Sequence, residues 1–135
     1  MISMILNLTQ HKATPEQIAQ GVVDASPEAQ LFIAELLTFD EIPSKEDITA
    51  RAEDLAEFAA MYDLSQDDNS DGVYPSSAMI GGAPFLMSAL EKELTNRGVT
   101  PLYAFSKRES VEKLENGKVV KTNVFKHIGL VKACK

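Results

Sequence analysis

The chain has 135 residues, enough for a hydrophobic core, and we expect residues 1–135 to form a single domain. An apolar content of 44% and a charged content of 24% exclude a disordered chain, and no apolar run approaches the roughly 20 residues of a membrane-spanning helix. The formal net charge of −7 argues against duplex nucleic acid as a partner. Because Cys134 is the only cysteine, we expect no internal disulfide and predict a cytoplasmic protein without membrane attachment.

The first strand and helix frame a polar loop. Residues 2–8 (ISMILNL) predict a short apolar strand, and Thr14, Pro15 and Gln17 predict a capped helix that carries Ile18 and Val22 on one face and ends near Gly21. First strands of parallel sheets present ligand-binding groups in the loop that follows. The candidates in this loop are Thr9, Gln10, His11 and Lys12.

Two further helices are expected before the middle of the chain. One starts at Pro27 and runs to about Leu37, with a strand as an open alternative near residues 36–43. The other follows Ser44 and has a buried stripe formed by Ile48, Ala52, Leu55, Ala59 and Tyr62. The polar loop 65–76 contains DDNSDG, which lacks the register of a calcium loop, so we predict no metal site there.

Residues 77–108 predict a strand–helix–strand unit. A strand at 78–80 leads into Gly81 and Gly82, Pro84 opens a helix with a buried leucine-rich stripe, and a strand at 99–105 ends at Ser106-Lys107-Arg108. A helix N-terminus and cations at a strand end both favour a phosphate. The alternative is that the glycines only turn the chain.

The last third of the sequence is basic and hairpin-like. Residues 99–135 hold eight basic and three acidic side chains, whereas residues 1–98 hold five basic and seventeen acidic ones, a net charge of −12. Alternating runs at 109–114 and 119–124 flank an Asn116-Gly117 turn, and 128–131 predicts a last strand. We therefore predict an α/β, three-layer Rossmann-like, mostly parallel sheet with an antiparallel C-terminal β-hairpin extension. The lysines either hold a small polyanion or line solvated hairpin edges.

Two stretches resemble a known family. The runs GVTPLYAFSKRESVE and VVKTNVFKHIGLV, together with the opening ILNLTQHKATPEQIAQG, are similar to small stand-alone proteins of the CRISPR-associated Rossmann-fold (CARF) superfamily. The resemblance implies a homodimer that binds a cyclic oligoadenylate second messenger. It also implies ring-nuclease activity, in which a ribose 2′-hydroxyl attacks its own phosphate without a metal or other cofactor.

Carried over by position, the resemblance assigns roles to individual residues. His11 and Lys107 are the candidate catalytic residues, for proton transfer and for stabilising charge on the phosphate. The candidate ligand-binding residues are Thr9, Gln10, Gly81, Gly82, Ser106, Arg108, Lys126 and His127. Two alternatives stay open: a nucleotide or phosphate sensor without catalysis, and a small interaction protein without a ligand whose basic hairpin docks on an acidic partner.

Overall fold

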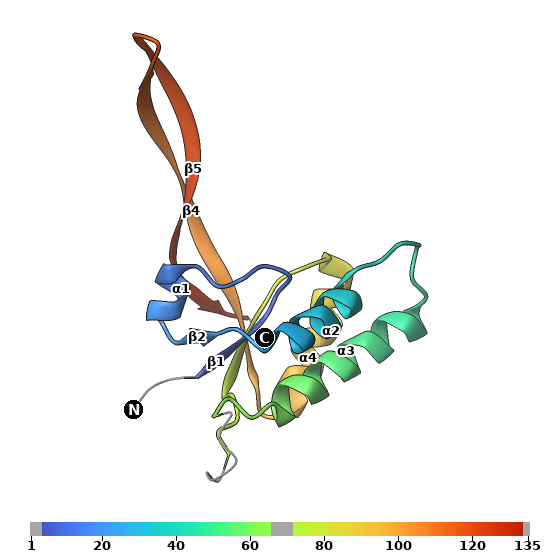
Figure 1. Cartoon of the computed structure of the whole chain (residues 1–135). Helices are drawn as coiled ribbons and strands as arrows, with labels where there is room; N and C mark the ends of the chain where they lie inside the picture. Colours follow the sequence, from blue (N-terminus) through green and yellow to red (C-terminus); the bar gives the residue numbers. More distant parts are fainter. Residues whose placement is uncertain (1–3, 66–71, 134–135) are drawn as a thin grey trace.

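The computed structural model describes residues 4–65 and 72–133, and it contains a five-stranded mixed sheet with helices packed against it (Figure 1). The strand order is β2-β1-β3-β4-β5, and the strands are Val22–Val23 (β2), Ile5–Leu8 (β1), Ser77–Ile80 (β3), Thr100–Glu115 (β4) and Lys118–Lys132 (β5). The first four strands are parallel, and β5 is antiparallel to β4. This is the expected Rossmann-like α/β sheet with a C-terminal hairpin.

The sheet separates two apolar layers of unequal size. Leu6, Leu8, Ala78 and Ile80 face the main core, which is closed by α2 (Pro27–Leu37), α3 (Lys45–Met61) and α4 (Pro84–Asn96). The opposite face holds a small cluster of Ile5, Val22 and Met79 beside the short helix α1 (Pro15–Ala19). The second layer is therefore thin.

The helix stripes predicted from the sequence are buried in α4 and in the middle of α3. Leu86, Met87, Leu90 and Leu94 of α4 are buried, as are Ala52, Leu55 and Ala59 of α3. The two ends of the α3 stripe are only partly buried, at Ile48 and at Tyr62, which lies just beyond the helix. Pro84 opens α4 and Ser44 caps α3 through its side chain, which accepts from the backbone N–H of Asp47. Residues 36 and 37 end helix α2, so the strand considered there is not formed.

The region after Thr14 differs from the prediction. The helix ends at Ala19, because Gly21 adopts a φ of 100° and redirects the chain. Val22 then pairs with Ile5 in the edge strand β2 and is buried in the sheet, not on a helix face. Ile18 is 56% exposed. The strand β2 could not be predicted from the sequence, because two residues are too few to show the alternation of a strand.

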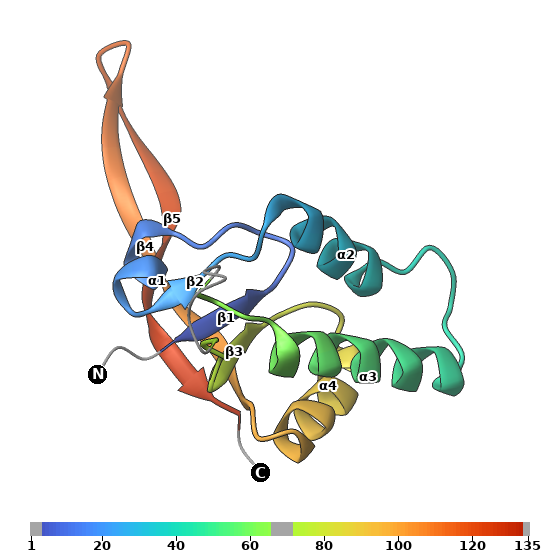
Figure 2. The ribbon, with the colours of Figure 1, turned by 60° about the horizontal axis from the view of Figure 1, so that its bottom comes forward.

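The C-terminal hairpin is longer than predicted. The strand predicted to end at Phe105 continues to Glu115, and the runs at 119–124 and 128–131 belong to one strand. The pairing shifts register between Phe105 and Ser106, where Ile128 of β5 is the extra residue of a β-bulge, and it then continues past the body of the sheet. Asn116 and Gly117 have φ values of 51° and 77°, as a type I′ turn requires. We call residues 106–128 the arm, which extends away from the body in both views (Figures 1 and 2).

Candidate functional site at the C-terminal edge of the sheet

A pocket of about 520 Å³ lies where β1, β3 and β4 meet their following segments. The β1–α1 loop and α1 contribute one wall, and the end of β3 with its glycine turn contributes the other. Its lining residues are Thr9, Gln10, His11, Lys12, Thr14, Gln17, Met79, Ile80, Gly81, Gly82, Tyr103 and Ala104. This volume is within the range of small-molecule sites.

Asn7 holds the β1–α1 loop in place. Its side chain is 5% exposed, and its amide Nδ2 donates to the His11 carbonyl at 2.7 Å. Its Oδ1 accepts from the Thr9 backbone N–H at 2.9 Å and from the Thr9 hydroxyl at 2.7 Å. One buried amide therefore fixes both ends of the segment that carries Gln10 and His11.

Asp24 completes this arrangement from the segment after β2. Its Oδ1 accepts from Asn7 Nδ2 at 2.8 Å and from the Ala13 backbone N–H at 3.0 Å. Neither Asn7 nor Asp24 was singled out from the sequence. An asparagine within the apolar run ISMILNL was the available signal, because a polar side chain inside a buried strand needs partners.

The other wall is the glycine turn that precedes α4. Gly81 and Gly82 line the pocket, and Gly82 adopts a φ of 155°. The first turn of α4 lies behind them and offers few N–H groups, since Pro84 has none and those of Leu86 and Met87 donate to the Ala83 carbonyl. The backbone of the glycine turn is therefore the part of this wall that a ligand can approach closely.

One cation lines the pocket, and carboxylates lie behind its walls. Lys12 is a cation among the lining residues, and no aspartate or glutamate is among them. Behind the pocket, the hydroxyl of Tyr103 donates to Glu91 Oε2. Burial, and then Glu91, raise the pKa of Tyr103, so its phenol stays protonated at neutral pH.

The structure separates the predicted site residues into two groups. Thr9, Gln10, His11, Gly81 and Gly82 come together in the pocket. Ser106, Lys107, Arg108, Lys126 and His127 lie instead at the base of the arm, and none of them is among the residues lining the pocket. The expectation that the Ser-Lys-Arg run stands at a strand end is wrong, because β4 continues through it.

Within the arm base, cross-strand pairing brings the second group together. Ser106 pairs with His127, and Lys107 pairs with Lys126. His127 Nε2 lies 2.8 Å from Gln20 Oε1, and its Nδ1 lies 3.5 Å from Nε2 of Gln17, which also lines the pocket. The arm base is thus attached to α1 beside the pocket, although it does not line it.

Neither a metal-binding cluster nor a membrane-spanning helix occurs in the described part of the chain. Within 4–65 and 72–133, no group of three or more His, Cys, Asp and Glu side chains is arranged to hold a metal ion. In the same part of the chain, no helix is both long and apolar enough to cross a membrane. The acidic residues Asp67, Asp68 and Asp71 of the 65–76 loop lie outside the described residues.

Together, the sheet order and the pocket define a Rossmann-like α/β protein with a polar pocket at the C-terminal edge of its parallel strands. The family model described as "Uncharacterized protein MJ1673 family" matches residues 3–131. The chain therefore belongs to the MJ1673 family. No curated protein and no solved structure matched it.

Proposed function

We propose that this protein binds a phosphate-bearing nucleotide second messenger, of the cyclic oligoadenylate class, in the pocket between the β1–α1 loop and the start of α4. The observation that carries this proposal is the combination of Lys12, the Gly81-Gly82 turn, and no carboxylate among the lining residues. A phosphodiester would approach the backbone of the glycine turn and accept from the Lys12 ammonium.

The sequence resemblance supplies the ligand class and the homodimer. A ring of several nucleotides is larger than a pocket of about 520 Å³, so each chain would hold only part of it. A two-fold dimer with both pockets toward one ring satisfies this requirement. The single cysteine supports placing this function in the cytoplasm.

Slow cleavage of the ring is a second candidate, favoured by the position of His11 in the pocket. The 2′-hydroxyl oxygen would attack the adjacent phosphorus and the bond to the 5′-oxygen would break. The hydroxyl proton would pass to His11, and the leaving 5′-oxygen would take up a proton. Lys107 lies on the arm, so its predicted catalytic role requires the arm base to reach the ligand.

A thermal-shift scan against cyclic tri-, tetra- and hexa-adenylate, with AMP and ADP as linear controls, tests the proposal. A ligand at one hundred times its Kd stabilises the folded state by about 2.7 kcal/mol, which raises the Tm visibly. Chromatography of the bound ligand then separates cleavage from sensing. No shift with any nucleotide would overturn the proposal and favour an interaction protein without a ligand.

Matched lysine variants locate the site. Lys12→Ala should weaken binding by roughly ten- to a hundredfold, since a charge-assisted hydrogen bond is worth about 1.5–3 kcal/mol. Lys92→Ala, on the exposed side of α4, should bind as the wild type does. Lys107→Ala with Arg108→Ala is expected to abolish binding if the arm base reaches the ligand. Normal binding by that double variant would restrict the site to the pocket.

A further inference from the structure

The arm lacks the support that a ribbon of its length needs. The nine residues from Lys107 to Glu115, at about 3.3 Å each, span roughly 30 Å. Figures 1 and 2 show this ribbon as two strands with no third strand or helix beside its outer part. Because a two-stranded hairpin is only marginally stable alone in water, the arm is expected to pack against something.

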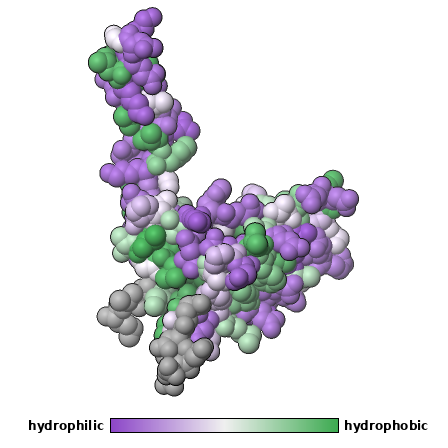
Figure 3. All heavy atoms as spheres, in the orientation of Figure 1, coloured by the Kyte–Doolittle hydropathy of each residue, from purple (hydrophilic) through white to green (hydrophobic). Residues whose placement is uncertain are grey.

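Apolar side chains at the arm tip are exposed on both faces of the ribbon. We define the arm tip as residues 113–120. Leu114 and Val119 are cross-strand partners and are 76% and 63% exposed. Val120 pairs with Lys113 on the other face and is 38% exposed. In the space-filling view, apolar patches interrupt the hydrophilic surface of the arm up to its end (Figure 3).

Charge indicates what the arm can contact. The arm carries six basic and three acidic side chains, so two arms repel one another. The body carries charge of the opposite sign, since residues 1–98 have a net charge of −12. A second copy of this chain therefore offers a complementary surface in its body and a repulsive one in its arm.

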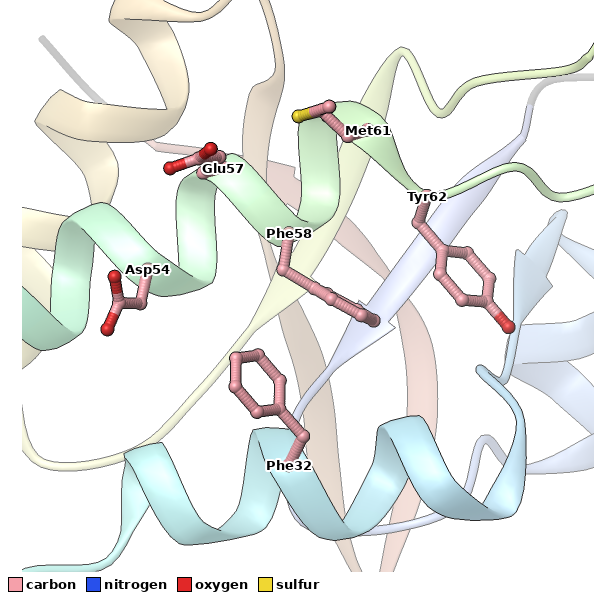
Figure 4. A pocket seen from close by; sticks show the side chains of 6 residues that line it. All are labelled: Phe32, Asp54, Glu57, Phe58, Met61 and Tyr62. Atoms are coloured by element: carbon pink, nitrogen blue, oxygen red, sulfur yellow. The ribbon is translucent and has the colours of Figure 1, made fainter.

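The body has an acidic, aromatic groove between α2 and α3 that matches the tip. This groove, of about 490 Å³, is lined by Phe32, Asp54, Glu57, Phe58, Met61 and Tyr62. Phe32 and Phe58 point toward one another from the two helices, with ring centroids 5.4 Å apart, and Asp54 lies one turn from Phe58 (Figure 4). Phe32 and Met61 are 41% and 69% exposed. The groove therefore offers apolar contacts beside two carboxylates.

We propose that two copies of this chain form a two-fold dimer in which the arm tip of each copy lies in the α2–α3 groove of the other. Leu114 and Val119, which share one face of the ribbon, pack against the aromatic side chains and Met61, and the ammonium groups of Lys113 and Lys118 reach Asp54 and Glu57 around the edges of the ribbon. Such an isologous exchange closes on itself and leaves no arm without a partner. The inference specifies the homodimer of the proposed function, but it does not depend on the ligand.

Charge reversal on the full chain tests this dimer. The wild type should have a mass of twice 14.8 kDa by sedimentation equilibrium. Lys113→Glu with Lys118→Glu, and separately Asp54→Lys with Glu57→Lys, should each yield monomers. An equimolar mixture of these two variants should form heterodimers, because each arm then meets a groove of opposite charge. Glu41→Lys with Glu53→Lys, at exposed positions outside the groove, should leave the dimer intact.

Two results would overturn the inference. One is a monomeric wild type at micromolar concentration. The other is a dimer that persists in both charge-reversed variants. Nucleotide binding is measured separately, so a monomer that binds nucleotide refutes the arm exchange, whereas a dimer that binds none refutes only the proposed ligand.

Discussion

At the scale of single residues, the candidate site depends on one buried amide. Asn7 joins the carbonyl of His11, the backbone and hydroxyl of Thr9, and the carboxylate of Asp24. Replacement by alanine removes these four hydrogen bonds. The loop that carries His11 and Lys12 is therefore no longer held against β1 by the Asn7 side chain.

We expect Asn7→Ala to lower the free energy of unfolding by about 2 kcal/mol, the cost of leaving buried polar groups unsatisfied. Urea denaturation monitored by circular dichroism measures it. Asn96→Ala, at the exposed end of α4, is the matched control and should change stability by less than about 0.5 kcal/mol. Equal effects of the two substitutions would show that Asn7 does not organise the loop.

Tyr103 yields a prediction about alkaline pH. Burial and the hydrogen bond to Glu91 raise the pKa of Tyr103 above its ordinary value of about 10. Because the pKa of Tyr103 is higher in the folded state than in the unfolded state, its protonated phenol contributes to the free energy of unfolding. This contribution is fully present below pH 10 and is lost as the pH rises toward the folded pKa. Ultraviolet titration should show late phenol ionisation that Tyr103→Phe removes. An alkaline titration curve without a late component that this substitution removes would contradict this.

The residues of the site were only partly predictable. Thr9, Gln10, His11, Gly81 and Gly82 follow strands directly, so their meeting at one sheet edge follows from parallel topology alone. Asp24 lies beside the loop because β2 pairs with β1. Its position could not be predicted, since a strand of two residues has no detectable periodicity in the sequence. Tyr103 lines the pocket from a strand whose length was misjudged.

At the scale of elements, the two glycines before α4 have different tasks. Gly82 has a φ of 155°, which side chains rarely adopt, whereas Gly81 does not have a positive φ. A Cβ on Gly81 would meet Thr9 Cγ2 at 3.5 Å, an ordinary contact. Sequence analysis predicts the same role for both glycines, because backbone angles are not visible in a Gly-Gly pair.

Gly82→Ala should therefore lower the free energy of unfolding by about 1–3 kcal/mol through backbone strain. Gly81→Ala should leave it nearly unchanged. Thermal and urea unfolding of the two variants side by side measure the difference. If both alanines are tolerated equally, the turn does not depend on the conformation of Gly82.

The length of the arm could not be predicted either. Local sequence supplied the Asn-Gly turn and the alternating flanks, and both are confirmed. The charged run Ser106-Lys107-Arg108 looked like a loop because strands inside a domain avoid such residues. Both faces of a ribbon outside the domain are exposed to solvent, so charged side chains are tolerated in its strands.

At the scale of the whole molecule, the chain combines an acidic body with a basic arm, and its pocket lies beside the arm base. His127 contacts Gln17 of α1 and Gln20 directly after α1, and these contacts connect the arm to the wall of the pocket. The proposed arm exchange and the proposed ligand site would therefore act on neighbouring parts of one assembly. Each proposal can fail without the other.

The central claim is that the pocket at the C-terminal edge of β1 and β3 binds a phosphate-bearing nucleotide. Amide chemical shifts of the isotope-labelled full chain, recorded during titration with cyclic tetra-adenylate and then with AMP, test it most directly. We predict saturable changes concentrated in residues 9–14 and 81–87. Changes confined to other segments, or none with either nucleotide at millimolar concentration, would contradict the claim.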